Sequence, residues 1–305
     1  MTANTDLADI NEIMLGYYLA GRKWFDAAAK SQVDQKSKKI KDPEAIKAQS
    51  AKAEVMAKEV IKWAKANKYS GTVKKVWWTA RPGSLGDAVK AEVDQRKNPT
   101  DILVQFTSGP ANGFLGISAK STKGSGDIGF KNPGIGTVEA ALNIKLKDVV
   151  DKATNQLIAK FKLPTGTSER KAAIRANEKI LSAAQIAGSG ALAAIRDAMF
   201  IKLKKLSQKE LQKYILTYWM DADSNLYPPY IKATGMGSKA PYTAKIDDPL
   251  KNDKLKAITS GQISLEKIGN ESIGVSANNK KILKMRAKFE SEKLASSVKF
   301  SGDPW

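Results

Sequence analysis

Residues 98–104 read Asn-Pro-Thr-Asp-Ile-Leu-Val, and residues 114–121 read Phe-Leu-Gly-Ile-Ser-Ala-Lys-Ser. Each stretch contains an apolar run of strand length. The residues between them, 108–113, are rich in turn formers, so the pattern predicts an antiparallel hairpin. Asp101 would open the first strand, and Lys120 would stand near the end of the second. If the two strands are neighbours, a carboxylate and an ammonium group meet in one sheet.

This pair of charges suits a specific chemistry. Cleavage of a phosphodiester needs a hard cation held on carboxylate oxygens and a cationic group near the water or the scissile phosphate. The segment resembles the restriction-endonuclease-like, PD-(D/E)XK, nucleases, whose signature is Pro-Asp, a spacer, and then (Asp/Glu)-x-Lys. Two departures stand out, because Thr100 separates the proline from Asp101 and Ser118 occupies the place of the second acid. The resemblance covers residues 73–135, and the first helix if Glu12 belongs to it.

The resemblance implies roles for individual residues. Asp101 would bind Mg²⁺ or Mn²⁺, and Lys120 would orient water or stabilise the pentavalent phosphate. Because a hydroxyl is a weaker magnesium ligand than a carboxylate, Ser118 leaves three alternatives open. The acid has moved to Glu12 in the first helix or to Asp127, or Ser118 binds the metal through water, or catalysis has been lost and the fold kept for DNA binding.

A second group of residues would contact nucleic acid. The glycine-rich segment 124–136 follows the lysine strand, and successive glycines let backbone N–H groups approach phosphate closely. The expected contacts are Lys123, Lys131, Asn132 and Arg81.

Each catalytic candidate also has an ordinary structural interpretation. Asp101 could cap the turn before a buried strand. Lys120 could be an edge-strand lysine that protects the sheet from aggregation. Glu12 could be an exposed helix acid. The positions of the side chains in the structure distinguish the catalytic interpretation of each residue from the structural one.

Composition narrows the function further. The chain has 305 residues, with 51 Lys and Arg against 31 Asp and Glu, a formal net charge of +20. Such a surplus favours a polyanionic partner, DNA before RNA, because neutralised phosphates release counterions. The absence of histidine excludes Ser-His-Asp triads, HNH and HKD nucleases and His-ligated zinc, and the absence of cysteine excludes thiol nucleophiles and disulfides. A nuclease built from carboxylates, lysine and magnesium survives both absences.

Targeting signals are not evident. The first residues lack the basic and apolar regions of a secretion signal, and no apolar run approaches the roughly 20 residues of a membrane span. We therefore expect a cytoplasmic protein without membrane contacts. The oligomeric state stays open, a homodimer included.

The remaining pattern predicts an α/β (α+β) fold, with a mixed central sheet flanked by helices, a helical insertion and a C-terminal β element. Apolar spacing predicts helices over residues 6–30, 43–67, 138–161 and 168–187, the last ending at Gly188. Four regions are expected: an N-terminal helical region (1–72), the nuclease-like core sheet (73–137), a helical region (138–220) and a C-terminal β-rich region (221–305) packed on the core.

The expected function is a magnesium-dependent DNA endonuclease from a restriction, mobile-element or phage context. The alternative is a non-catalytic DNA-binding or virion-associated protein that retains the nuclease fold. A basic structural or assembly protein without a nucleic-acid role is a third, weaker interpretation, and it predicts DNA binding that is weak and insensitive to salt.

Overall fold

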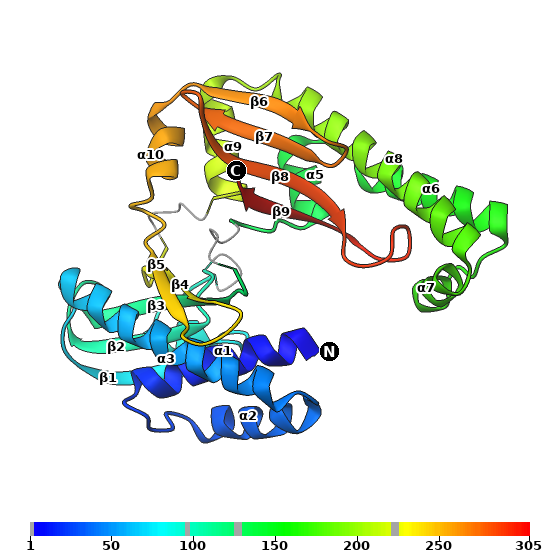
Figure 1. The fold of residues 1–305 in the computed structure, drawn as a ribbon. Helices are drawn as coiled ribbons and strands as arrows, with labels where there is room; N and C mark the ends of the chain where they lie inside the picture. The colour runs from blue at the N-terminus through cyan, green and yellow to red at the C-terminus, as the bar shows by residue number, and fades with distance from the viewer. Residues whose placement is uncertain (1–2, 95–97, 125–129, 221–225) are drawn as a thin grey trace. The chain divides into compact units, whose positions relative to one another are not determined.

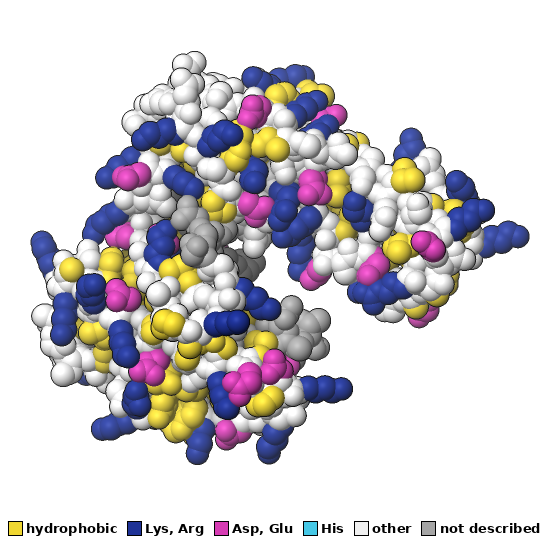
Figure 2. Space-filling model, in the orientation of Figure 1, with side chains coloured by type: hydrophobic (Ala, Val, Ile, Leu, Met, Phe, Trp, Pro, Cys, Tyr) yellow, Lys and Arg dark blue, Asp and Glu magenta, His cyan; other side chains and the backbone are white. Residues whose placement is uncertain are grey.

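The computed structural model describes residues 3–94, 98–124, 130–220 and 226–305. The chain forms two compact units, which we describe separately (Figure 1). Unit 1 comprises Met1–Asp127 and Asp223–Asn252, and unit 2 comprises Ile128–Ala222 and Asp253–Trp305. Lysine and arginine side chains are spread over the visible surface of both units (Figure 2), as the net charge of +20 requires.

Unit 1 contains a five-stranded mixed sheet and four helices among its described residues. The sheet order is β1-β2-β3-β4-β5, and every neighbouring pair is antiparallel except β3 and β4, which are parallel. The elements are α1 (Ala3–Leu19), α2 (Ala27–Lys39), α3 (Pro43–Ala66), β1 (Ser70–Trp78), α4 (Ser84–Val89), β2 (Ile102–Ser108), β3 (Phe114–Ser121), β4 (Tyr230–Met236) and β5 (Thr243–Asp247), with a single 3₁₀ turn at Ala111–Gly113.

The expected hairpin is present. β2 pairs with β3 from Ile102 opposite Ile117 to Gln105 opposite Phe114. Alternate side chains of these strands lie on opposite faces. Ile102 and Ile117 join the core beneath α1 and α3, whereas Leu103 and Phe114 join a smaller cluster with Leu85 of α4. The mixed α/β class predicted from sequence is therefore confirmed, with helices on both faces of the sheet.

The helix predicted over residues 6–30 is two helices. α1 ends at Leu19, and Gly21 and Arg22 have φ values of 71° and 62°. This left-handed backbone cannot continue a right-handed helix. α2 then begins after Asp26, whose side chain accepts a hydrogen bond from the Ala28 amide. The expected start of the next helix is correct, since Asp42 caps α3 and Pro43 is its first residue.

Unit 2 consists of a four-stranded antiparallel sheet, in the order β6-β7-β8-β9, and helices that pack on one of its faces. Its elements are α5 (Ile135–Leu142), α6 (Lys147–Phe161), α7 (Thr167–Ala176), α8 (Glu178–Leu203), α9 (Gln208–Tyr218), α10 (Asp253–Ser260), β6 (Ile263–Ile268), β7 (Ser272–Ala277), β8 (Lys280–Phe289) and β9 (Val298–Pro304). Figure 1 shows α5, α8 and α9 along one side of this sheet.

The helix stop predicted at Gly188 is wrong, because α8 runs through it from Glu178 to Leu203. A Cβ on Gly188 would lie only 2.6 Å from the Cβ of Lys293 in the β8–β9 connection. The glycine therefore serves close packing of a loop against the helix rather than termination. The predicted helix over residues 138–161 is likewise divided, since α5 ends at Leu142 and Asn143 has a φ of 51°.

The structure divides the chain differently from the four regions expected. Helices α1 and α3 pack on the first sheet, and α2 packs on α1 in the same unit, so residues 1–72 are part of the core rather than a separate region. The expected C-terminal β region supplies β4 and β5 to unit 1 and β6 to β9 to unit 2. Within the described ranges, none of the helices has the length and apolar character that crossing a membrane requires.

Candidate functional site

Asp101 immediately precedes β2, and its main chain is held on both sides. Its amide donates to the Ile117 carbonyl at 3.0 Å, and its carbonyl accepts from the Thr79 amide at 3.0 Å. Its carboxylate oxygen Oδ2 accepts three hydrogen bonds, from the Ala119 amide at 2.8 Å, the Ser118 hydroxyl at 3.3 Å and the Lys120 ammonium at 3.4 Å. The carboxylate is thus fixed in position, yet about 25% of the side chain stays exposed.

The turn before Asp101 is built by a buried asparagine. Asn98 Oδ1 accepts from the amide and the hydroxyl of Thr100, at 3.1 and 2.6 Å. Its Nδ2 donates to the carbonyls of Tyr227 and Pro228, at 3.3 and 3.1 Å, just before β4. Asn98 therefore connects the start of β2 to the start of β4, two segments that are far apart in sequence.

Thr100, the residue that departs from the family signature, packs its side chain against Gly116 of β3. A Cβ on Gly116 would lie 2.1 Å from Thr100 Oγ1. Gly116 therefore leaves the space that the threonine hydroxyl occupies. The pair keeps Asp101 against β3 even though a residue separates it from Pro99.

Ser118 and Lys120 project on the same face of β3 as Asp101. Ser118 is buried, whereas 45% of the Lys120 side chain is exposed. Since residues two apart on a strand share a face, the position expected for the second acid does lie beside Asp101, and it carries a hydroxyl. Lys120 is the exposed cationic partner of this set.

Glu12 enters from α1. Its Oε2 accepts a hydrogen bond from Trp78 Nε1 at 3.1 Å. One turn further along α1, Gly16 permits a close approach to the sheet, because a Cβ there would lie 2.6 Å from Phe25 and 3.3 Å from Ile102 Cδ1. Glu12 is thus a half-buried acid near the beginning of β2, and the exposed-helix interpretation does not hold.

The electrostatics connect Glu12 to Asp101. Burial, followed by the negative charge of Asp101, raises the pKa of Glu12 from 4.5 to about 8, and the hydrogen bond from Trp78 opposes the shift. Asp9 also raises it, and Lys120 lowers it. Two carboxylates in one site repel each other, so ionising both costs free energy. Near neutral pH Glu12 therefore retains its proton unless a cation replaces it.

The sequence analysis missed two residues of β4. Lys232 lies directly opposite Ser118, and Thr234 lies opposite Lys120, in the parallel β3–β4 register. Paired residues share a face, so Lys232 adds a second lysine beside the Asp101 cluster. The Thr234 hydroxyl is buried and has no partner among the described residues. Only the pairing of β3 with β4 reveals them, since nothing local distinguishes residues 230–236 from another strand.

The exit from β3 is held by a buried lysine of α3. Lys52 Nζ donates to the Thr122 carbonyl at 2.7 Å, and the Thr122 amide donates to the Gly235 carbonyl at 2.9 Å. Burial lowers the pKa of Lys52, and the charge of Lys123 lowers it further. Lys123 itself is exposed and follows this clamp directly, in the same unit as Asp101.

The other expected contacts are dispersed. Lys131 and Asn132 belong to unit 2, where Lys131 Nζ donates to the Thr217 carbonyl at 3.0 Å. The described residues 130–133 of the glycine-rich segment lie in no helix or strand, and two main-chain hydrogen bonds join Phe130 and Lys131 to Gly302 of β9. Arg81 is exposed in the β1–α4 connection of unit 1. Asp127 lies outside the described residues.

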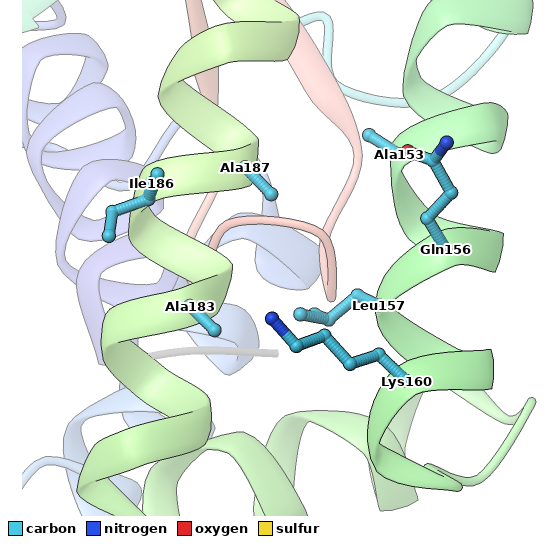
Figure 3. Close-up of a pocket in the computed structure, with 7 residues that line it drawn as sticks. All are labelled: Ala153, Gln156, Leu157, Lys160, Ala183, Ile186 and Ala187. Carbon is cyan, nitrogen blue, oxygen red and sulfur yellow. The ribbon is translucent and has the colours of Figure 1, made fainter.

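A shallow apolar groove lies between α6 and α8 in unit 2. Figure 3 shows Leu157 and Lys160 of α6 reaching toward Ala183 and Ala187 of α8. The groove contains one cation and no carboxylate or other nucleophile among its lining residues. It therefore lacks the groups that hydrolysis needs, and the Asp101 cluster remains the candidate site.

Comparisons and metal-ligand geometry give no further assignment. No protein-family model matches this chain, and no curated protein has a significantly similar sequence. Across the described residues, no group of three or more Asp or Glu side chains is arranged to hold a metal ion. The site offers two carboxyl groups, Asp101 and Glu12, with the Ser118 hydroxyl beside them.

Proposed function

We propose that this protein is a magnesium-dependent DNA endonuclease and that the Asp101 cluster is its active site. One observation carries the proposal: Ser118, Lys120 and the Ala119 amide donate hydrogen bonds to one carboxylate oxygen of Asp101. The negative charge of the same carboxylate helps to raise the pKa of Glu12. The arrangement agrees with the resemblance to the PD-(D/E)XK nucleases. The net charge of +20 fits a phosphate-rich substrate.

The two carboxyl groups suit a divalent cation. Mg²⁺ is usually bound through one or two carboxylates, with substrate phosphate and water completing its shell. Burial and the negative charge of Asp101 raise the pKa of Glu12, and a cation between the two carboxyl groups would replace the proton that Glu12 keeps. With Ser118 in place of an acid, we expect weak metal binding that becomes stronger when substrate phosphate is present.

The protein's own groups would then act as follows. Asp101 and Glu12 would hold the cation, which supplies charge neutralisation at the scissile phosphate. Lys120 is held by Asp101 at 3.4 Å and half exposed, so its ammonium can turn toward the attacking water or the phosphate. Ser118 would orient the Asp101 carboxylate by the hydrogen bond it already donates. Lys123 and Lys232 would add positive charge for the DNA backbone.

The test is cleavage of supercoiled plasmid in Mg²⁺, Mn²⁺ or EDTA. Wild-type protein should nick or linearise plasmid only with a divalent cation, and Asp101→Ala and Lys120→Ala should each lose at least about 100-fold of the rate. Lys58→Ala, an exposed lysine on α3, is the matched control and should cut normally. Cleavage that survives both site substitutions would reject the site assignment.

A second candidate is a DNA-binding or virion-associated protein that keeps the fold without catalysis. The observation that favours it is the buried Ser118 hydroxyl where the family has an acid, which leaves Asp101 and Glu12 as the carboxyl groups that the described residues bring to the site. This candidate predicts salt-sensitive DNA binding with no cleavage of plain or modified DNA or RNA under any divalent cation. Binding that is weak and independent of salt would instead support a structural protein.

A further inference from the structure

The sheet of unit 2 has one face that the helices leave uncovered. Its buried side chains, such as Leu265, Val275, Met285 and Phe300, pack with α8 and α9 in a single core. Because side chains alternate along a strand, the intervening residues form the opposite face. Figure 1 shows this face free of helices, and Figure 2 shows lysine and arginine side chains distributed over it.

β8 supplies most of the charge on this face. Its ten residues contain no acid and include Lys280, Lys281, Lys284, Arg286 and Lys288. A shift in register next to Ser276 places Lys281 on the same face as the last three. Successive cations along the strand are therefore about 7 Å apart. No other strand among the described residues carries more than two basic residues.

Most of this charge is not neutralised within the face. Arg286 pairs with Asp303 at 3.0 Å, but Lys284 and Lys288 have no carboxylate partner in the described part of the chain. Lys288 also lies directly opposite Lys299 of β9. Lys299 forms an ion pair with Glu290 at 2.7 Å, which offsets its repulsion of Lys288. Lys284 and Lys288 therefore remain as cations of this face that form no ion pair in the described part of the chain.

Small residues lie between the lysines, and the apolar side chains of Ile268 and Trp305 cover one of them, Gly274. Gly274, Ser272 and Ser276 belong to β7, and Ser301 belongs to β9, opposite Arg286. The Ser301 hydroxyl is 97% buried and has no hydrogen-bond partner among the described residues.

Trp305 borders the same face. A Cβ on Gly274 would lie 2.7 Å from the Trp305 ring, and Lys281 Nζ lies 4.5 Å from the ring centroid. The indole thus rests on the glycine and supports the lysine. The row of cations along β8 fits a chain of phosphates better than a compact ligand.

We propose that the uncovered face of β6–β9, with Lys281, Lys284 and Lys288 as its main contacts, binds the phosphate backbone of DNA. The choice of DNA as the polyanion rests on the proposed function, whereas the surface itself does not. Binding here would be independent of base sequence, since each contact is an ammonium or hydroxyl group on phosphate oxygen. Unit 2 would then provide affinity, and the Asp101 cluster of unit 1 would provide chemistry.

The test measures DNA binding in an uncleaving background. Asp101→Ala protein is titrated against a fluorescent 30-base-pair duplex between 50 and 300 mM KCl, alone and with Lys281→Gln, Lys284→Gln and Lys288→Gln combined. The matched control combines Lys152→Gln, Lys179→Gln and Lys205→Gln, three exposed lysines on or beside the helices of the same unit. Thermal unfolding should show the β8 variant to be about as stable as its parent, because Lys281, Lys284 and Lys288 form no ion pair in the described part of the chain.

We expect the β8 variant to lose about 10- to 100-fold of affinity at 150 mM KCl and the slope of log K against log [KCl] to fall by about 2 to 3. The control should change affinity less than about 3-fold. Equal loss in both variants, or no loss in the β8 variant, would overturn the proposal. So would tighter binding to phosphatidylserine vesicles or polyglutamate than to DNA.

Cleavage and binding can fail separately. If wild-type protein cuts no DNA but the β8 variant weakens binding, the surface stands and the endonuclease fails. If plasmid cleavage depends on Asp101 but the β8 and control variants bind DNA equally well, the endonuclease proposal stands and this surface is rejected.

Discussion

The Glu12 carboxyl group makes the stability of unit 1 depend on pH in a direction that can be measured. Its pKa is raised from 4.5 to about 8 by burial and by Asp101. In the unfolded chain Glu12 ionises near 4.5, whereas in the folded protein it keeps its proton until about pH 8. The unfolded state therefore binds fewer protons in this window, and stability must fall as the pH rises.

The magnitude follows from the shift. Each pKa unit corresponds to about 1.36 kcal/mol, so this one group should remove on the order of 5 kcal/mol of folding stability between pH 4.5 and 8. Above pH 8 the loss should level off, because Glu12 is then ionised in both states. Glu12→Gln cannot ionise, and it keeps an acceptor for Trp78 Nε1, so the variant should lack this loss.

The assay is urea unfolding at intervals from pH 4.5 to 9 in EDTA, followed by tryptophan fluorescence. Four of the six tryptophans lie in unit 1, so the signal mainly reports that unit. The measured quantity is the stability of Glu12→Gln minus that of wild type. It should grow with pH to a plateau, and Glu59→Gln, on α3 of the same unit, should show no such growth.

Asp101→Asn provides an internal check. Removing the neighbouring negative charge should move the midpoint of the pH-dependent loss to lower pH, since Asp101 is the second cause of the shift. A difference between Glu12→Gln and wild type that stays within 1 kcal/mol from pH 5 to 8.5 would refute the reasoning. Glu12 would then be solvated, and its placement beside Asp101 would be wrong.

Three further predictions test the site's framework. Gly116→Ala should destabilise unit 1 by about 1 to 3 kcal/mol in urea unfolding because its Cβ would meet Thr100 Oγ1 at 2.1 Å. Adding Thr100→Ala should recover part of that loss, and strictly additive effects would argue against the contact. Asn98→Ala should cost about 2 to 4 kcal/mol, since it leaves the Tyr227 and Pro228 carbonyls without their donor; a loss below 0.5 kcal/mol would contradict this. Ser118→Asp should lower the melting temperature in EDTA, recover it in 10 mM MgCl₂ and tighten Mg²⁺ binding in calorimetry, whereas unchanged metal affinity would place Ser118 outside the site.

Local sequence was sufficient for the centre of the first sheet. The runs ending in Val104 and beginning at Phe114 have strand length, and the turn formers between them leave little alternative to a hairpin. The proximity of Asp101 and Lys120 follows from that hairpin, because one short connection is enough to bring their strands together. The helix starting at Pro43 was equally local, since Asp42 and Pro43 form a cap that acts within one turn.

The role of a glycine in a helical pattern was ambiguous, because a glycine that ends a helix and a glycine that allows close packing look alike in the sequence. Gly21 ends a helical region through its positive φ, whereas Gly188 lies inside α8 and makes room for the Lys293 side chain. Both are single glycines in helical patterns. Only the position of the β8–β9 connection, about a hundred residues later in the chain, distinguishes them.

The sequence by itself determined the α/β class, the Asp101–Lys120 hairpin, the cationic character and the exclusion of histidine and cysteine chemistry, because each depends on composition or on neighbours along the chain. Tertiary structure decided the rest. The parallel pairing of β3 with β4 brings Lys232 beside Ser118 across more than a hundred residues, and the packing of α1 on the sheet brings Glu12 to Asp101. Such contacts form because a whole face of a helix or sheet must be buried. The apolar pattern in the sequence predicts that a face is covered, but it does not identify the distant segment that covers it.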